Sequence, residues 1–184
     1  MAQLKTYGWV DKTFHWLVVL NLSATLIGSP GMASLPLAER ALEYGDHGAS
    51  VTTLAILMML RLVWRLFHPF PPLPDSMTRL EKYAAKTVHW GLYALIFAQI
   101  GIGLLLASTT EVDFVPSLYN LNYTALGLVP VGAHDTLLTL HNIGYWAIVA
   151  AIAIHVLAAL KHALIDRDGV LTRMLPFVKA RRPG

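Results

Sequence analysis

Apolar residues occur along the chain in four long blocks that are separated by shorter polar connections. The blocks cover approximately residues 14–31, 47–66, 88–107 and 140–164. Each approaches the roughly 20 residues that a helix needs to cross about 30 Å of hydrocarbon. This pattern predicts an all-α fold, an integral membrane four-helix bundle that occupies residues 1–184 as a single domain.

The first block also has a rival interpretation as a secretory signal, because Lys5 and Lys12 precede its apolar core. However, His15 and Asn21 lie inside the block, and such polar side chains are unusual in a disposable signal. We therefore expect the block to be retained as the first helix. The longest connection, residues 108–139, is expected to contain at most a short surface helix.

Charged residues are divided unequally between the two sides of this topology. Thirteen of the fourteen Lys and Arg residues fall on one side, namely Lys5, Lys12, Arg61, Arg65, Arg79, Lys82, Lys86, Lys161, Arg167, Arg173, Lys179, Arg181 and Arg182. The other side carries Arg40 and six acids, namely Glu39, Glu43, Asp46, Glu111, Asp113 and Asp135. Because basic residues concentrate in cytoplasmic loops, both termini are expected to be cytoplasmic. The pI near 9.3 then reflects membrane orientation, and we expect no nucleic-acid partner.

Composition narrows the cofactor chemistry further. Hydrophobic residues make up 55% of the chain and charged residues only 14%, and the sequence contains no cysteine. Iron–sulfur clusters, thiolate metal sites and covalently attached heme are therefore excluded. Ionisable residues inside membrane spans are costly and usually functional. Five of the eight histidines lie in or at the edge of the predicted spans, namely His15, His47, His89, His141 and His155.

The spacing of four of these histidines predicts two pairs at two depths. His141 and His155 are fourteen residues apart, so they share a helix face to within about 40° and are separated by about 21 Å along the axis. His15 lies near the cytoplasmic start of the first helix, and His47 lies at the outer start of the second. The pattern predicts His47–His141 outside and His15–His155 inside, with each pair filling both axial positions of a heme iron. Such a heme transfers electrons.

Two arginines near the end of the second span are candidates for the same site. Arg61 follows His47 by fourteen residues, which places it on the same face and at the depth of His155. Heme propionates are anionic, and a guanidinium binds carboxylates well. Arg61 is therefore a candidate propionate partner. Arg65 is equally well explained as a residue whose charge reaches out to the membrane interface.

The remaining histidines leave several alternatives open. His162 follows His155 by seven residues, on the same face and about 10 Å nearer the cytoplasm. It is either a hydrogen-bonding partner for a quinone or a solubilising residue at the helix end. His89 is an alternative iron ligand, a propionate partner or an interfacial residue, and the last two are favoured. No role is assigned to His68 or His134.

Short motifs surround these histidines. They are His15-Trp16-Leu17, His47-Gly48, Arg61-Leu62-Val63-Trp64-Arg65, His141-Asn142-Ile143-Gly144-Tyr145, Asp168-Gly169-Val170-Leu171 and Arg173-Met174-Leu175-Pro176. With them, the sequence resembles the bacterial four-helix cytochrome b561 family over nearly the whole chain. The resemblance implies two non-covalent b hemes with His15, His47, His141 and His155 as iron ligands. It also implies electron exchange with ubiquinone or another membrane quinone.

The resemblance includes a superoxide oxidase, so oxidation of superoxide outside and reduction of ubiquinone inside is the leading expectation for activity. An anionic donor prefers a positive entrance, whereas the outer loops are mostly acidic. Oxidation of superoxide therefore requires an entrance to the outer heme whose charge differs from the average charge of the outer loops. An alternative function is a membrane-anchor cytochrome b subunit that relays electrons for a dehydrogenase or hydrogenase partner. A third is a non-redox membrane protein with unrelated histidines.

Overall fold

The structure, a computed structural model, describes residues 6–68 and 70–178, and every regular element within these ranges is helical. The four long helices are α1 (Trp9–Gly28), α2 (Leu37–Phe67), α3 (Arg79–Ala107) and α4 (His134–Lys161). Each is long and apolar enough to cross a membrane. The predicted all-α architecture with four spanning helices is therefore confirmed.

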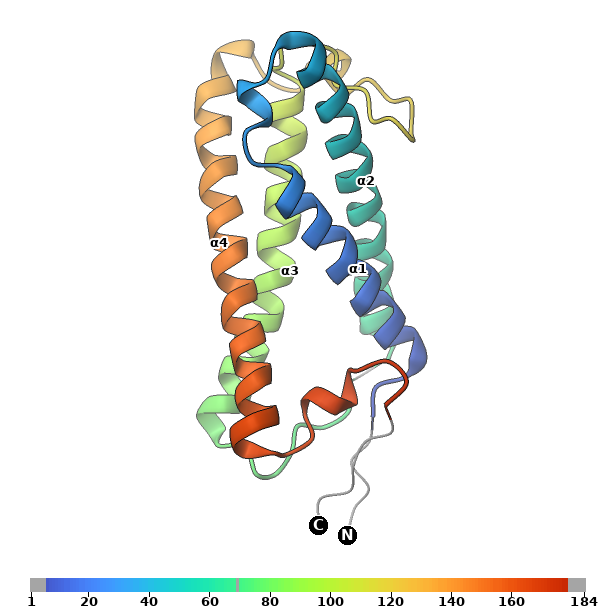
Figure 1. Cartoon of the computed structure of the whole chain (residues 1–184), viewed down its shortest axis with the longest axis vertical. Coiled ribbons are helices and arrows are strands. Elements are labelled where there is room, and N and C mark those ends of the chain that lie inside the picture. The colour runs from blue at the N-terminus through green and yellow to red at the C-terminus, as the bar shows by residue number, and fades with distance from the viewer. Residues whose placement is uncertain (1–5, 69, 179–184) are drawn as a thin grey trace.

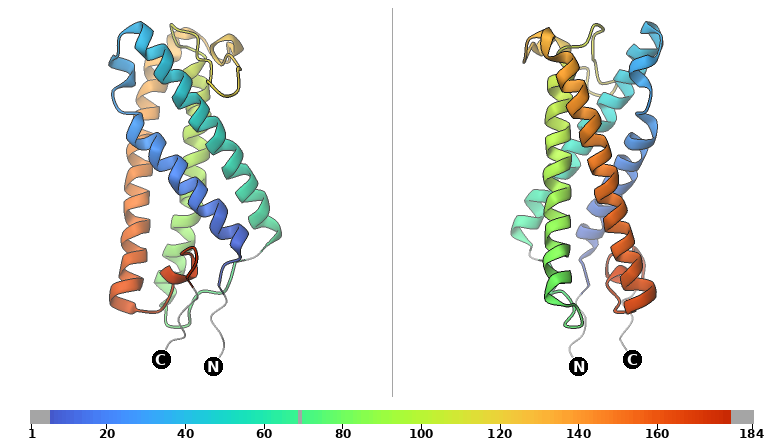
Figure 2. Two further views of the ribbon diagram at one scale, coloured as in Figure 1. Left: turned by 45° about the vertical axis from the view of Figure 1, so that its right-hand side comes forward. Right: turned by 90° about the vertical axis from the view of Figure 1, so that its left-hand side faces the viewer.

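The helices form two antiparallel hairpins. The most extensive contacts join α1 to α2 and α3 to α4, and contacts between the hairpins are much sparser. In Figure 1, α3 and α4 run side by side, whereas α1 crosses the bundle obliquely. Figure 2 shows that the two hairpins lean against each other along the long axis of the molecule. The space between the hairpins is therefore the place where groups from α1, α2 and α4 can meet.

All four helices begin before the starts that hydrophobicity predicts, and α1 begins at Trp9 rather than near residue 14. α2 begins at Leu37 rather than near residue 47, and α3 begins at Arg79 rather than near residue 88. The segment 37–46 was expected as a loop because it is polar, but it is rich in Leu, Ala, Glu and Arg, which favour helices. The start of α4 at His134 is likewise six residues early. Hydrophobicity marks only the part of a helix that lies in hydrocarbon.

The start of α3 is defined by a capping box. The Glu81 amide donates to Thr78 Oγ1 at 3.2 Å, and the Thr78 amide donates to Glu81 Oε2 at 2.8 Å. These reciprocal bonds satisfy amides that have no partner inside the helix. Lys161 at the end of α4 also donates to Glu81, at 2.8 Å. Glu81 of the capping box thus joins the start of α3 to the end of α4, which lie at the same end of the bundle.

The outer surface of the bundle is strongly apolar. Leu20, Ile27, Trp146 and Leu157 are each at least 65% exposed, which suits a surface surrounded by lipid rather than water. The central packing is small by comparison and is formed by residues from all four helices. These residues are Val18, Leu22, Leu54, Met58, Tyr93, Ile96 and Ile148.

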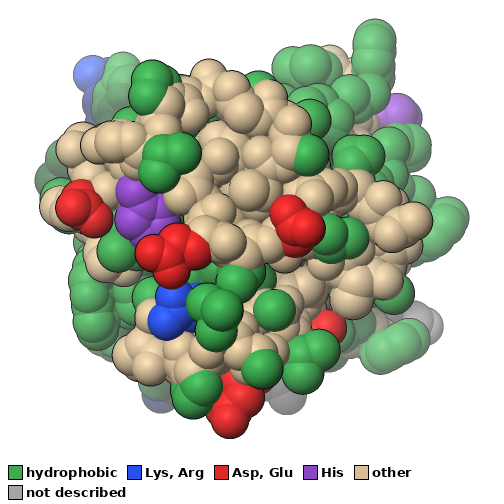
Figure 3. Space-filling view, turned by 90° about the horizontal axis from the view of Figure 1, so that it is seen from above, with side chains coloured by type: hydrophobic (Ala, Val, Ile, Leu, Met, Phe, Trp, Pro, Cys, Tyr) green, Lys and Arg blue, Asp and Glu red, His purple; other side chains and the backbone are tan. Residues whose placement is uncertain are grey.

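Charge distinguishes the two ends of the bundle. At the basic end, α1 and α3 begin and α2 and α4 end; it carries Lys12, Arg61, Arg65, Arg79, Lys82, Lys86, Lys161, Arg167 and Arg173. Lys5, Lys179, Arg181 and Arg182 lie outside the described residues. The opposite, acidic end carries the six acids and Arg40, and Figure 3 shows acidic side chains spread among uncharged ones on this face.

The long connection between α3 and α4 folds across the acidic-end part of α2. Phe114 stacks on Tyr44 with ring centroids 5.2 Å apart, and the Ser117 amide donates to the Gly45 carbonyl at 3.0 Å. A Cβ at Gly48 would lie only 2.5 Å from the Phe114 ring. Gly48 therefore lets this connection pack closely against α2. Within the connection between α3 and α4, the only regular elements are two 3-10 turns, Thr124–Leu126 and Val131–Ala133.

We expect Gly48→Ala to destabilise the protein, because the new methyl group would force Phe114 out of its place. Overpacking of this kind costs about 1–3 kcal/mol, measurable as a lower unfolding temperature in detergent. Gly91→Ala is the matched control, since a Cβ there meets no heavy atom within 4 Å and Ala favours helix. Equal effects of the two substitutions would contradict the assigned role of Gly48.

Candidate functional site

The basic-end pair consists of His15 from α1 and His155 from α4. His15 lies in the second turn of α1, and His155 lies in the last third of α4. Their ring centroids are 6.4 Å apart, with an angle of 65° between the ring planes. The structure therefore brings these two rings to one depth, as helical spacing and topology predict.

The acidic-end pair consists of His47 from α2 and His141 from α4, with ring centroids 6.5 Å apart. Its surroundings are neutral. Ser29 Oγ lies 3.3 Å from His47 Nδ1, and the Gln99 side-chain amide donates to the backbone carbonyl of His141 at 2.9 Å. Gly103 allows the His141 ring to approach α3, because a Cβ there would lie 3.1 Å from the ring. All four predicted ligands thus fall into the two predicted pairs.

The separation within each pair fits a metal between two imidazoles. A metal–imidazole bond is about 2.0–2.1 Å long, and a ring nitrogen lies roughly 1.1 Å from the ring centre. Two imidazoles on opposite sides of one metal therefore have centroids about 6.3 Å apart. His141 Nδ1 is also buried without a hydrogen-bond partner, which is unfavourable unless another group binds the ring. The donor set and the spacing both fit the expected heme iron.

Arg61 reaches the basic-end pair from α2. Its Nη2 lies 3.2 Å from His15 Nδ1. Because a guanidinium only donates, His15 Nδ1 must accept this bond, and the neutral ring then carries its proton on Nε2. Arg61 is therefore at the depth that its spacing from His47 predicts. If His15 Nε2 takes an iron, Nδ1 regains a proton when Arg61 turns to an anionic partner such as a carboxylate.

His89 from α3 lies closer to the site than the sequence suggested. Its ring centroid is 5.4 Å from that of His155, which is shorter than the separation of two axial ligands. The structure therefore places His89 beside the basic-end pair, inside the bundle, rather than at the membrane interface. The i, i+4 spacing of His89 and Tyr93 on one face of α3 was the available signal. This spacing did not settle the position of His89, because the depth of His89 in the bundle could not be judged without knowing where α3 begins.

His162 lies in a π-helical turn, His162–Asp166, that follows α4. Its side chain is buried, and its Nδ1 lies 2.8 Å from Asp168 Oδ2 and 3.0 Å from Asp166 Oδ2. These carboxylates hold a proton on Nδ1 and leave Nε2 for another partner. Lys161 donates to Asp166 at 2.6 Å, and this ammonium group disfavours a metal cation in the same cluster.

The segment after α4 turns back across the basic end. Lys12 Nζ donates to the Leu175 carbonyl at 2.9 Å, and Trp16 Nε1 donates to the Met174 carbonyl at 3.0 Å. Both donors belong to the first two turns of α1, next to His15. This segment therefore closes the basic end of the bundle beneath the basic-end pair.

Arg173 fixes the same segment from its other side. It is only 2% exposed, and its guanidinium donates to the Pro72 carbonyl at 3.0 Å and lies 5.7 Å from the Tyr7 ring. Burial raises the pKa of the Tyr7 phenol, and the charge of Arg173 opposes that rise. Tyr7 therefore remains a neutral phenol that packs against the guanidinium.

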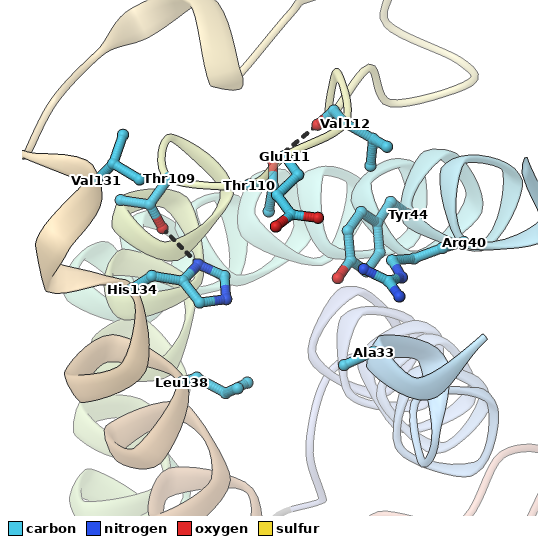
Figure 4. A pocket seen from close by; sticks show the side chains of 10 residues that line it. All are labelled: Ala33, Arg40, Tyr44, Thr109, Thr110, Glu111, Val112, Val131, His134 and Leu138. Carbon is cyan, nitrogen blue, oxygen red and sulfur yellow. Dashed lines mark hydrogen bonds between the residues drawn. The ribbon is translucent and has the colours of Figure 1, made fainter. Parts of the chain in front are cut away.

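A polar pocket of about 300 Å³ opens at the acidic end (Figure 4). Arg40, Tyr44, Glu111 and His134 line it, and Thr109 Oγ1 lies 2.9 Å from His134 Nδ1. Arg40 precedes His47 by seven residues and His134 precedes His141 by seven, so each lies about two turns farther out on the same helix face. The pocket therefore lies on the outer side of the acidic-end pair, and it includes a histidine to which the sequence assigned no role.

Comparison with known proteins gives matches over nearly the whole chain. A family model described as prokaryotic cytochrome b561 matches residues 6–177. The chain is 34% identical over 180 residues to cytochrome b561 homolog 2 of Escherichia coli (strain K12), with 92% of this chain and 90% of that protein covered. It is 26% identical over 185 residues to probable superoxide oxidase CybB of Yersinia pestis, with 94% and 97% covered. The family match includes all four spanning helices.

Proposed function

The chain belongs to the prokaryotic cytochrome b561 family, and on that premise we propose that it conducts electrons across the membrane between two b hemes. Family membership makes it a multi-pass membrane cytochrome b that transfers electrons. We propose further that residues 1–184 form one transmembrane cytochrome b domain. In this proposal the acidic-end pair holds an outer heme and the basic-end pair holds an inner heme.

The observation that carries this proposal is the repeated spacing of the rings. Two pairs of imidazoles, from different helices and at opposite ends of the bundle, have centroids 6.4 Å and 6.5 Å apart. Chance packing of histidines in a membrane bundle gives no reason for two such similar separations. Bound heme supplies reversible one-electron chemistry at its iron. Two imidazoles would be available to each iron, a donor set that suits electron transfer rather than oxygen binding.

Arg61 is proposed to bind a propionate of the inner heme. It is the basic group nearest to His15 within the bundle, at 3.2 Å, and a carboxylate accepts charge-assisted hydrogen bonds from a guanidinium. Transfer of Arg61 from His15 Nδ1 to a carboxylate would leave Nδ1 free to carry a proton. That tautomer would leave the Nε2 lone pair of His15 available to an iron.

The basic end is proposed to face the cytoplasm of a bacterial inner membrane. The nine Lys and Arg residues of the basic end, against Arg40 alone at the acidic end, support this orientation. The acidic end would then face the periplasm and receive electrons. The basic end would face the cytoplasmic half of the membrane, where a quinone can take up protons.

Superoxide is the proposed donor and ubiquinone or a related quinone the proposed acceptor. Two superoxide anions each lose one electron and leave as O₂, while one quinone gains two electrons and two protons and leaves as quinol. The pocket at the acidic end supports the donor step, because Arg40 places a cation there among loops that are otherwise acidic. Arg40 Nε and Nη2 donate to the Leu35 carbonyl at 3.2 Å and 2.9 Å. These two hydrogen bonds hold the Arg40 guanidinium at the mouth of the pocket.

A second candidate is a cytochrome b subunit that relays electrons for a dehydrogenase or hydrogenase partner. The connection after α3 favours it, because this connection exposes apolar side chains at the acidic end. Leu118 is 75% exposed and Val131 is 71% exposed, and exposed apolar residues at one end can mark a protein interface. Incubation of the purified chain with a superoxide source and quinone separates the two candidates. Absence of superoxide-driven heme reduction would favour the subunit.

Reduced-minus-oxidised absorption with heme quantification is expected to give two low-spin b hemes per chain. His141→Ala is expected to remove only the outer heme and His155→Ala only the inner heme, because each ring serves one pair. His68→Ala, at an exposed position of the second connection, is the control and is expected to retain both. Loss of the same heme in both variants, or a single heme in the unmodified protein, would refute the pairing.

Arg40→Gln is expected to lower kcat/KM for superoxide by a few-fold, on the order of 2–10, because it removes the cation that attracts the anion. The remaining rate should also depend less on ionic strength. Glu39→Gln alters a charge at the same end but outside the pocket lining, and it serves as the control. An Arg40→Gln protein with unchanged rate and salt dependence would exclude this role.

His162→Ala is expected to raise KM for quinone while the heme absorption spectrum stays unchanged. Its Nε2 can accept from a quinol hydroxyl, or donate to a quinone carbonyl when the ring carries both protons. The measurement is steady-state quinone reduction at several quinone concentrations, with His68→Ala as the control. A normal KM in His162→Ala would leave this residue with a structural role, through Asp168.

A further inference from the structure

Arg65 is held in a cage of three aromatic side chains near the basic end of α2. Its guanidinium carbon lies 4.2 Å from the centroids of both Phe70 and Trp90, and 5.3 Å from that of Tyr93. Phe70 comes from the connection after α2, and the other two rings come from α3. Cation–π contacts orient a guanidinium without neutralising its charge.

Within residues 6–68 and 70–178, no carboxylate compensates this charge by direct contact. Among the residues that the structure describes, no acid lies within ion-pairing distance of Arg65. The acid at the start of α1, Asp11, accepts instead from Trp64 Nε1 at 3.2 Å. Arg65, whose guanidinium is a permanent cation, is therefore half-buried among aromatic side chains.

This charge belongs to the surroundings of the basic-end pair. Arg61 lies on α2 one turn before Arg65, and its guanidinium carbon is 5.7 Å from the same Tyr93 ring. Arg61 in turn reaches His15 at 3.2 Å. Side chains on α3 lean toward its start at the basic end, which brings the Tyr93 ring toward the depth of His89 and His155.

In the described part of the chain, no matching charge contacts the acidic-end pair. The side chains that contact His47 and His141 are Ser29 and Gln99, both neutral. The nearest cation along α2 is Arg40, two turns farther out, and Glu111 lines the same pocket. The positive and negative charges at that mouth oppose each other, whereas at the basic end the two charges of Arg61 and Arg65 outnumber the one of Asp11.

A positive charge stabilises a nearby site more when that site holds an additional electron. The effect is larger in a low-dielectric bundle than in water, and salt screens it less. A heme propionate bound to Arg61 would cancel the charge of Arg61 locally, but the charge of Arg65 would remain. The two sites should therefore differ in reduction potential even if their ligands are identical.

We propose that Arg65, fixed in its aromatic cage, makes the basic-end pair the site of higher reduction potential and so directs electrons from the acidic end toward the basic end. This inference rests on the proposed function, because it requires a heme at each pair. It assigns Arg65 an electrostatic role and no contact with substrate. Each electron that leaves the donor at the acidic end is gained by the acceptor at the basic end, and two such electrons with two protons complete the reduction of one quinone to quinol.

Redox titration of the purified holoprotein, followed by absorption, tests this proposal directly. The unmodified protein is expected to show two midpoint potentials, with the inner heme higher. Arg65→Gln is expected to shift the inner heme to lower potential and leave the outer heme unchanged, whereas Arg65→Lys should retain most of the original value. The His141→Ala and His155→Ala proteins identify which potential belongs to which heme.

Arg79→Gln is the matched control, because it removes an exposed positive charge at the same end of the bundle, where solvent screens it. Its potentials are expected to match those of the unmodified protein. An inner heme of lower potential than the outer heme in the unmodified protein would overturn the proposal, and this test does not depend on the folding of any variant. Two hemes with unchanged potentials in Arg65→Gln would also overturn it. Absence of bound heme in the unmodified protein would instead refute the proposed function itself.

Discussion

The need to partner imidazole rings inside a membrane bundle is the constraint on which the arrangement of this protein depends. α4 contributes one ring near each end, so α1 must approach it at the basic end and α2 at the acidic end. The oblique path of α1 in Figure 1 agrees with this requirement. The hairpins otherwise contact each other sparsely. A cofactor between the paired rings would therefore also join the two halves of the bundle.

The distribution of basic residues serves more than membrane orientation. Arg61 and Arg65 belong to the excess of positive charge at the basic end, yet both side chains turn into the bundle, toward His15 and toward an aromatic cage. At the acidic end, Arg40 and Glu111 share one pocket. In the proposed function, this one gradient of charge along the bundle would bear on orientation, on donor entry and on the relative potentials of the two sites.

Helical spacing accounted for the pairing of His15 with His155 and of His47 with His141, because depth and azimuth along a helix follow from residue number. The ends of the helices were less accessible. α2 begins at Leu37 because its polar first turns lie beyond the apolar span, and α3 begins at Arg79 because Thr78 and Glu81 cap it. Because α3 begins at Arg79, well before His89, the His89 side chain lies inside the bundle. The sequence had also allowed a position for His89 at the membrane interface.

The sequence by itself determined four spans, the charge difference between the ends and the two depths of the histidines. Hydropathy, charge and helical periodicity are properties of the linear chain. Only the tertiary structure decided that Gly48 faces Phe114, that Asp168 pairs with His162 and that three rings enclose Arg65. Most of these contacts join different helices or loops, and they depend on how the helices rotate and lean against each other. That rotation is set by packing between side chains distant in sequence, which no local pattern records.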